Sequence, residues 1–288
     1  MDSVELFFIS LGAAVVVYYG VKLLLFSRML FPKLWFPLSK TFFTSMGEWA
    51  VVTGASEGIG RAYTFALAEQ GMSVVIMSRT KATLDQVAKE IVNNVGILPS
   101  YIPCKFLESA ELDQTITKVI NCNVKTMVKM CKIILPGMEN RGKGVIVNIS
   151  SGVASIPFPL YTLYAASKVF VERFSQGLQA EYKDKGIIIQ AVAPFGVSTR
   201  MASYQKTNIV TLSPEDFVKS SLQYLKAGDK TNGSVYHIIM GWLLQSMPLK
   251  VLYAESVLNN LQDYVKKIAA QKASLSASSA TLQNGRNK

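Results

Sequence analysis

Histidine and cysteine are scarce in this chain: one histidine, His237, and three cysteines occur among its 288 residues. A single histidine in an apolar stretch excludes histidine-dependent hydrolase triads and histidine-based metal sites, so we expect His237 to be structural. The cysteines, Cys104, Cys122 and Cys131, are odd in number and have no paired spacing. They therefore predict neither a disulfide framework nor a zinc site.

Acidic residues are also few, and none follows Asp263. Lysine and arginine total 30 against 19 aspartate and glutamate residues, a net charge of +11. The end of the chain, residues 266–288, has only basic charges: Lys266, Lys267, Lys272, Arg286 and Lys288. Such a tail suits an anionic membrane surface or RNA. The serine-rich run Ser274–Ser279 instead favours a disordered, solvated end, and we expect no nucleic-acid partner.

One long hydrophobic run, Leu6–Phe26, has a single charge, Lys22. As a helix it would be about 31 Å long, which matches a hydrocarbon core of roughly 30 Å. An acidic start and the bulky residues that follow distinguish it from a cleaved signal peptide. We predict a membrane anchor over residues 1–27 and a linker over 28–46. Arg28, Lys33 and Lys40 then favour a cytoplasmic body by the positive-inside rule.

Apolar strands alternate with helices after the linker. Strands are predicted at Trp49–Val52 and Ser73–Ser78, with helices at Ile59–Gln70 and Lys81–Ile91. Later elements are strands at Gly144–Ile149 and Gly186–Val192 and helices at Tyr161–Tyr182 and Pro214–Lys226. This order predicts an α/β domain, a doubly wound parallel sheet of the Rossmann type, over residues 47–200.

Residues 201–265 are predicted to form a substrate cap and C-terminal helices. Within them, Val235–Leu258 is apolar and is interrupted by His237, Pro248 and Lys250. The stretch could cover a substrate, dip into the membrane or pack as core, and the sequence leaves these alternatives open.

A glycine-rich loop, Thr53-Gly-Ala-Ser-Glu-Gly-Ile-Gly60, lies between the first strand and the first helix. Glycines there allow a tight turn and close approach of the backbone to a pyrophosphate, which the helix N-terminus stabilises. The predicted cofactor contacts in the loop are Thr53, Gly54, Ser56, Gly58, Ile59 and Gly60.

The second strand is followed by Arg79, 19 residues past Gly60. Enzymes that use NAD usually have an acidic residue at this place, where it binds the ribose hydroxyls. A guanidinium can instead pair with the 2′-phosphate of NADP. We therefore expect NADP(H), with a solvated surface arginine as the alternative for Arg79.

Tyr164 and Lys168 are four residues apart in Tyr164-Ala-Ala-Ser-Lys168, on one face of a predicted helix. A nearby ammonium favours the tyrosinate and is expected to lower the tyrosine pKa. Ser151 precedes Tyr164 by 13 residues and lies at the end of a predicted strand. Its hydroxyl can hydrogen-bond the substrate carbonyl oxygen to which Tyr164 would pass its proton. The combination predicts proton transfer to a carbonyl.

These motifs together resemble the short-chain dehydrogenase/reductase family. Asn93-Asn-Val-Gly96 is similar to its Asn-Asn-Ala-Gly segment, and Asn123 to its helical asparagine. Pro194-Phe-Gly-Val-Ser-Thr199 resembles the segment that touches the nicotinamide, with Phe195 in place of the usual glycine. The resemblance adds cofactor contacts at Asn93, Asn94, Gly96, Tyr164, Lys168, Val197 and Thr199.

The resemblance implies hydride transfer from NADPH to a ketone, with Tyr164 as the acid. Lys168 would hold the ribose, Ser151 would orient the carbonyl, and Asn123 would support a water that links Lys168 to solvent. The implied substrate is a 17-ketosteroid, as in the conversion of androstenedione to testosterone, and a long-chain 3-ketoacyl-CoA is the alternative. An endoplasmic reticulum membrane location is implied, and a homodimer is left open.

The chain departs from the family after the second predicted helix. The family has a third strand, a helix and a fourth strand there, whereas here Ile91 is followed directly by Val92 and Asn93. Elements and loops of ordinary length make this a loss of roughly 35–40 residues. Because the fourth strand lies beside the first, we expect apolar sheet surface to be exposed next to the cofactor. A catalytically inactive isoform is therefore a second hypothesis.

Overall fold

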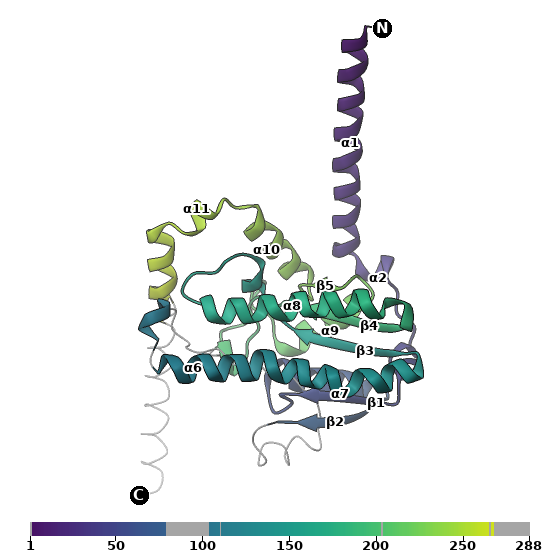
Figure 1. Cartoon of the computed structure of the whole chain (residues 1–288), viewed down its shortest axis with the longest axis vertical. Coiled ribbons are helices and arrows are strands. Elements are labelled where there is room, and N and C mark those ends of the chain that lie inside the picture. The colour runs from purple at the N-terminus through teal and green to yellow at the C-terminus, as the bar shows by residue number, and fades with distance from the viewer. Residues whose placement is uncertain (1, 79–103, 110, 203, 265, 268–288) are drawn as a thin grey trace, which may run out of the picture.

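The computed structural model describes residues 2–78, 104–109, 111–202, 204–264 and 266–267. The strands of this part are β1 Trp49–Thr53, β2 Ser73–Met77, β3 Gly144–Ile149, β4 Ile187–Val192 and β5 Lys230–Thr231. The α-helices include α1 Ser3–Leu30, α2 Pro32–Trp35, α3 Phe42–Met46, α4 Gly58–Glu69, α6 Leu112–Val119, α7 Thr126–Arg141, α8 Thr162–Tyr182, α9 Pro214–Ser221, α10 Val235–Ser246 and α11 Leu249–Leu252, and residues 255–264 are helical as well. Figure 1 shows α1 projecting from an α/β body.

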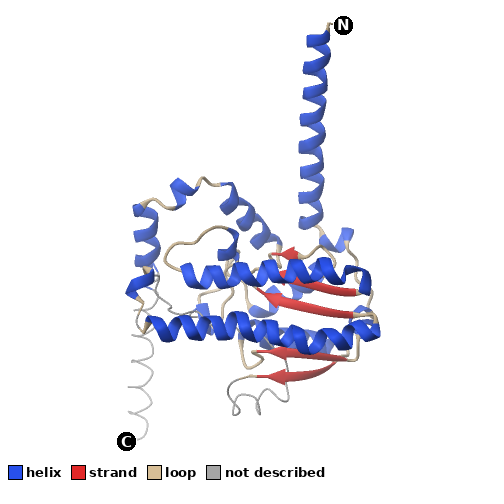
Figure 2. Cartoon of the chain, viewed as in Figure 1, coloured by secondary structure: helices blue, strands red, loops and turns tan. Residues whose placement is uncertain are grey.

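The described strands fall into two parallel sheets (Figure 2). In one sheet β1 pairs with β2, from Trp49 opposite Ser73 to Thr53 opposite Met77. In the other sheet the order is β3-β4-β5, and Gly144 lies opposite Ile187. The predicted α/β class with parallel strands is confirmed, and so is a truncated sheet, since no described strand joins β1 to β3.

Helices cover both faces of the β3-β4-β5 sheet and one face of the β1-β2 sheet, because alternate side chains of each strand point to opposite sides. On one side Val52 of β1 and Val192 of β4 pack with residues of α4 and α9, among them Phe217. On the other side Ile146 of β3 and Ile189 of β4 pack with α7 and α8. The α4 and α9 layer therefore spans both sheets and holds them in one body.

A cavity of about 140 Å³ lies between the two sheets. Val51 and Thr53 of β1 line one side, and residues 145–149 of β3 line the other. Side chains of α7, Asn123 and Lys168 complete the wall. The cavity therefore lies between β1 and β3, and β3 is the first described strand after the predicted deletion.

The outer face of the small sheet is exposed, as the predicted deletion requires. Trp49, Val51, Val75 and Met77 are large apolar residues with exposed side chains. The register places Val51 directly opposite Val75, so these side chains share one face of the sheet. Apolar surface of this kind is normally covered by helices in a parallel sheet.

The segment between the anchor and β1 is helical and partly buried. Phe42 and Phe43 of α3 are buried and pack with Leu225. The helix predicted at Pro214–Lys226 differs in extent from the structure: the α-helix ends at Ser221 and continues as a tighter 3-10 turn. Pro248 separates α10 from α11, in agreement with the predicted interruption of the apolar stretch Val235–Leu258.

The helix α1 is long and apolar enough to cross a membrane, with a mean hydropathy of 1.9 over its most apolar window. The same window has none of its residues buried against the protein body. Length and composition agree with the predicted anchor.

Candidate active site

The glycine-rich loop joins β1 to α4 at the carboxyl end of β1. Gly54 has a φ of 77° and donates its backbone N–H to the carbonyl of Met77 at 2.8 Å. Gly58 has a φ of 65°, a conformation that residues with a Cβ rarely adopt. Because α4 begins at Gly58 and Glu57 makes no side-chain cap bond there, the first N–H groups of the helix remain available for an anion.

The segment that follows β4 closes against this loop. A Cβ added to Gly58 would lie 2.9 Å from Cγ2 of Thr199, so the two segments meet closely. Arg200 forms an ion pair with Glu57 at 2.8 Å, and the Tyr204 hydroxyl donates to the same carboxylate at 3.1 Å. Val197 is buried and pairs with Leu212. The predicted contacts Gly58, Val197 and Thr199 are therefore brought together.

Ser56 accepts a hydrogen bond from Ser78 at 3.1 Å, which ties the loop to the end of β2. Arg79, the predicted NADP contact, comes next in the chain and lies outside the described residues, as do Asn93, Asn94 and Gly96. The remaining predicted loop contacts, Thr53, Ile59 and Gly60, lie at the end of β1 and in the first turn of α4.

Ser151, Tyr164 and Lys168 meet where β3 ends and α8 passes over it. Ser151 follows β3, and its hydroxyl accepts the N–H of Val153 at 3.4 Å, which starts a short 3-10 turn. Tyr164 is buried in the first turn of α8 and hydrogen-bonds Ser151. Lys168 lies one turn later, and its Nζ is 5.6 Å from the centre of the Tyr164 ring.

Burial governs the protonation of both groups. It raises the pKa of Tyr164 to about 12, and the hydrogen bond from Ser151 only partly opposes this. Burial also lowers the pKa of Lys168 to about 8, against a smaller opposite effect of Cys122. The sequence predicted a lower pKa for Tyr164 because of the Lys168 ammonium. The net direction in this structure is the opposite, because desolvation of the buried phenol outweighs its favourable neighbours.

Asn123 lies in a π-helical segment, Ile120–Lys125, between α6 and α7. Segments of this kind are frequent at functional sites. The buried Asn123 amide donates to the Ser167 hydroxyl at 3.0 Å, and Ser167 donates to the carbonyl of Tyr164 at 2.7 Å. Asn123 is therefore linked to the turn of α8 that carries Tyr164 and Lys168.

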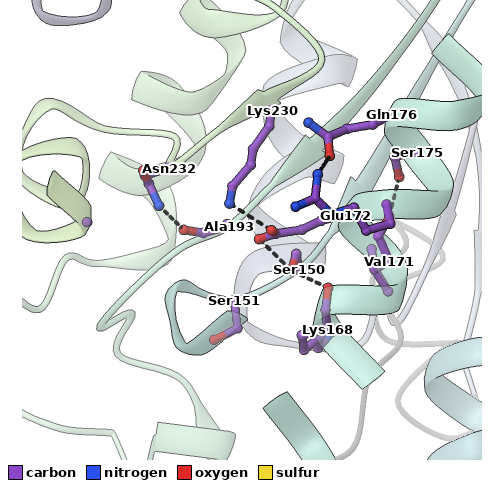
Figure 3. Close-up of polar contacts among 12 residues, drawn as sticks. Ser150, Ser151, Lys168, Val171, Glu172, Ser175, Gln176, Ala193, Lys230 and Asn232 are labelled. Carbon is purple, nitrogen blue, oxygen red and sulfur yellow. Dashed lines mark hydrogen bonds and ion pairs between the residues drawn. The ribbon is translucent and has the colours of Figure 1, made fainter. Parts of the chain in front are cut away.

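A buried ionic network behind the site was not predicted from the sequence (Figure 3). Glu172 is paired with Lys230 at 2.7 Å, with side chains 7% and 29% exposed. Ser150 donates to the Lys168 carbonyl at 2.9 Å and to Glu172 at 3.2 Å. The spacing could have indicated Glu172, because it lies four residues after Lys168 on the same face of α8.

Phe195 and His237 close the other side of the site. His237 is fully buried, and burial lowers its pKa. Its ring accepts the N–H of Phe195 at 3.4 Å and lies 3.1 Å from the Val210 carbonyl, in agreement with a structural role. A Cβ on Gly152 would lie 2.5 Å from the Phe195 ring, so the bulky Phe195 requires the glycine next to Ser151.

The residues present fit a dinucleotide. The loop provides a glycine turn that a side chain would obstruct and a free helix N-terminus that suits phosphate, and both face the end of β1. Ser151 follows β3 of the neighbouring sheet, Tyr164 and Lys168 are on α8 packed against that sheet, and Lys168 lines the cavity between the sheets. Within the described residues, the arrangement suits proton donation to a carbonyl beside a bound nucleotide.

A family model described as short chain dehydrogenase matches residues 48–97 and 90–209 in two pieces. The chain is 51% identical to 17-beta-hydroxysteroid dehydrogenase type 3 of Danio rerio, over 92% of this chain and 98% of that protein. It is 40% identical to the Homo sapiens protein of that name, over 88% and 92%. It is also 40% identical to very-long-chain 3-oxoacyl-CoA reductase of Homo sapiens, over 74% and 80%.

Among solved structures, a short-chain dehydrogenase from Sphingobium yanoikuyae in complex with NADPH is similar. Its TM-score is 0.57 at 25% identity, over 64% of this chain and 87% of that one. The alignment with the Danio rerio relative spans 302 positions, but 92% of 288 residues is about 265. About 37 positions of that relative thus have no counterpart here, in agreement with the predicted internal deletion.

Proposed function

The chain belongs to the short-chain dehydrogenase family and is an oxidoreductase by descent, and on this basis we propose that its site reduces a 17-ketosteroid with NADPH. The observation that carries the proposal is the meeting of Ser151, Tyr164 and Lys168 in a chain 51% identical to a protein named as a 17-beta-hydroxysteroid dehydrogenase. The relatives support a ketoreductase of this family, and the proposal adds a steroid as the substrate and NADPH as the cofactor.

In the proposed reaction NADPH, when bound, supplies the hydride that adds to the ketone carbon. The Ser151 hydroxyl donates to the ketone oxygen and fixes its direction. Tyr164 transfers its phenolic proton to the same oxygen, and the C=O bond becomes a C–OH bond. A phenol with a pKa of about 12 is fully protonated at neutral pH, which suits the donor role in reduction.

NADPH is favoured over NADH by Arg79, which stands where an acidic residue would bind the ribose hydroxyls of NAD. Solved structures of similar fold are complexes with NADPH and with NADH, so they support a nicotinamide cofactor of either kind. The substitution Arg79→Asp should shift the preference from NADPH towards NADH, whereas Lys81→Asp, two residues later, serves as the control. An unchanged ratio of the two KM values in Arg79→Asp would contradict the phosphate contact.

The steroid dehydrogenase and the acyl-CoA reductase of Homo sapiens are each 40% identical to this chain, so identity alone does not separate the two substrates. Relatives named as steroid dehydrogenases match over 88–92% of this chain, against 74% for the Homo sapiens acyl-CoA reductase. This broader match favours the 17-ketosteroid. Membranes that contain the protein should therefore reduce androstenedione faster than a long-chain 3-ketoacyl-CoA, and the reverse order would favour the acyl-CoA.

The location proposed for this activity is the endoplasmic reticulum membrane, with the body on the cytoplasmic side. The support is the long apolar helix α1, with Arg28 in its last turn and Lys33 and Lys40 after it. Protease added to sealed microsomes should digest the body completely. Protection of the body would place it on the other side of the membrane.

The break between β1 and β3 favours a second candidate function: a membrane-bound form that keeps its catalytic side chains but does not bind NADPH tightly. The glycine loop follows β1, while Ser151 follows β3, and in the described residues the two strands belong to different sheets. In the described residues their spacing then depends on helix packing and loop contacts and not on a strand ladder. A misplacement of about 1 Å can lower a rate by about 10²-fold.

One experiment separates the two candidates. Microsomes with this chain are compared with microsomes carrying the same chain with the relative's ~37 residues inserted after Ile91. NADPH binding and androstenedione reduction in both would support an active enzyme as the chain stands. Both properties only in the restored chain would establish the second candidate for this polypeptide. Neither property in the restored chain would contradict the steroid reductase proposal itself.

A further inference from the structure

The helix α10 has two faces that differ in what covers them. His237, Ile238 and Gly241 are buried against the body. Tyr236, Ile239, Trp242 and Leu243 are exposed on the opposite side, and α10 contains no aspartate, glutamate, lysine or arginine between Val235 and Ser246. An apolar helix face that meets only water is unfavourable, so this face requires a covering partner.

The exposed surface continues from α10 into α11. Met247, Leu249 and Val251 are exposed, and Trp242 and Val251 are each 55% exposed. We call the exposed residues Tyr236, Ile239, Trp242, Leu243, Met247, Leu249 and Val251 the α10–α11 face. Large contiguous apolar surfaces of this type mark protein or membrane contacts.

The α10–α11 face is continuous with the foot of the anchor. The Phe26 ring at the end of α1 contacts the Trp242 ring, with 5.9 Å between centroids. Figure 1 shows α10 and α11 on the side of the body from which α1 projects, level with the last turns of that helix. Exposed apolar residues Phe31, Leu34 and Trp35 lie at the same foot.

The composition of this region matches the bilayer interface. Tyr236, Trp35 and Trp242 have the amphipathic rings that concentrate at the headgroup level. Lys250 of α11 is exposed beside the exposed apolar residues Leu249 and Val251, and its long stem would allow the ammonium to reach anionic headgroups. Apolar side chains on one face with cations at its margin are typical of helices that lie in the interface.

We propose that the α10–α11 face rests in the bilayer interface as a second membrane contact beside the α1 anchor. A lipid surface is favoured over a protein because α1, which is suited to span the membrane, already brings the bilayer to Trp242. A protein partner would have to fit in the corner between the anchor and the body.

The contact would also fix the site relative to the membrane. The hydroxyl of Tyr253, directly after α11, donates to the carbonyl of Pro157 at 2.6 Å, in the loop that follows Ser151. His237 of α10 is bonded to Phe195 beside the same serine. The bilayer surface would therefore lie on the side of the body that carries the segment after Ser151. This step does not rest on the identity of the substrate.

The test uses the full chain in vesicles whose lipids carry bromine on the acyl chains, which quenches tryptophan at short range. Trp35, Trp49 and Trp242 are replaced by Phe, and one new probe is introduced by Val251→Trp. The control is Ile133→Trp on α7, whose native side chain is 70% exposed and apolar. We expect at least twofold quenching for the Val251→Trp probe and little for the control.

Two outcomes would overturn the proposal. Equal quenching of both probes would mean that the α10–α11 face has no special contact with lipid. Quenching that disappears as the protein density in the vesicle rises would identify a second copy of the chain as the occupant. Met247→Trp provides an independent probe if Val251→Trp alters the fold, and circular dichroism of each variant monitors this.

Discussion

Lys168 donates from its buried Nζ to the backbone carbonyl of Ile149 at 2.9 Å, so α8 is joined to the end of β3 by a lysine with a lowered pKa. The side chain is nearly inaccessible to solvent, and burial brings its pKa to about 8. The group that positions the site is therefore also one that opposes folding when it carries its charge.

The substitution Lys168→Met should stabilise the protein at neutral pH while it abolishes ketone reduction. The pKa of Lys168 in the folded protein, about 8, lies below the ordinary lysine pKa of 10.5. Between these values the unfolded chain binds the proton and the folded chain does not, so stability rises with pH across this window. Below about pH 8 the charged lysine costs the folded state on the order of 3 kcal/mol, which the variant recovers.

Thermal unfolding in detergent at pH 7 and pH 10 measures this effect. The variant should unfold at a higher temperature than the parent at pH 7, by about 5 °C or more. The difference should narrow as the pH approaches 10. A difference that is independent of pH would mean that the Lys168 ammonium is not the destabilising group.

Tyr164→Phe removes the proposed acid and leaves the ring. Ketone reduction by the restored chain should fall by about 10²–10⁴-fold, because that is the usual contribution of a positioned acid. NADPH affinity should change little. The control is Tyr182→Phe at the far end of the same helix, and the rate is measured by single-turnover oxidation of NADPH. Retained turnover in Tyr164→Phe would remove this residue as the proton donor.

Glu172→Gln leaves Lys230 without its buried partner. We expect a loss of about 1–3 kcal/mol in the free energy of unfolding, less than for a fully buried pair because the Lys230 side chain is 29% exposed. The additional substitution Lys230→Met should recover part of the loss. Glu181→Gln, on the exposed side of α8, is the matched control. Equal effects at positions 172 and 181 would show that the buried ion pair is unimportant.

Gly152→Ala introduces a methyl group 2.5 Å from the Phe195 ring, so the ring must move. A cost of about 1–3 kcal/mol is expected for such overpacking. In the Phe195→Ala background the same change should cost less than half as much, since the obstacle is gone. Gly177→Ala is the control because nothing lies within 4 Å of its added Cβ. Additive effects at positions 152 and 195 would contradict the close contact.

Local sequence patterns predicted most of the fold. The hydrophobic strands at Trp49 and Gly144 and the helix that carries Tyr164 appear within one or two residues of the predicted bounds. The internal deletion was also visible, because only 33 positions separate Gly60 from Asn93. The number of residues between two motifs limits which strands and helices can lie between them. It does not show how the neighbouring strands and helices rearrange.

Contacts between distant segments could not be predicted in this way. Lys230 meets Glu172 across 58 residues, and Phe195 meets Gly152 across 43, so neither pair has a local pattern. The pKa of Tyr164 was expected to fall because the sequence places Lys168 nearby. The sequence does not show how deeply Tyr164 is buried. Desolvation depends on everything packed around a group, and here it determines the sign.

The break between β1 and β3 has a consequence for the life of the protein in a cell. Strands that end a sheet offer backbone N–H and C=O groups to any other extended chain, and natural folds usually protect them. Among the described residues, β1 and β3 have such edges on either side of a cavity, and the exposed Val51 lines it. The anchor confines many copies to one surface, which raises the frequency with which these edges meet. Clustering on the membrane and early degradation are the expected fate of the chain unless a strand fills the gap.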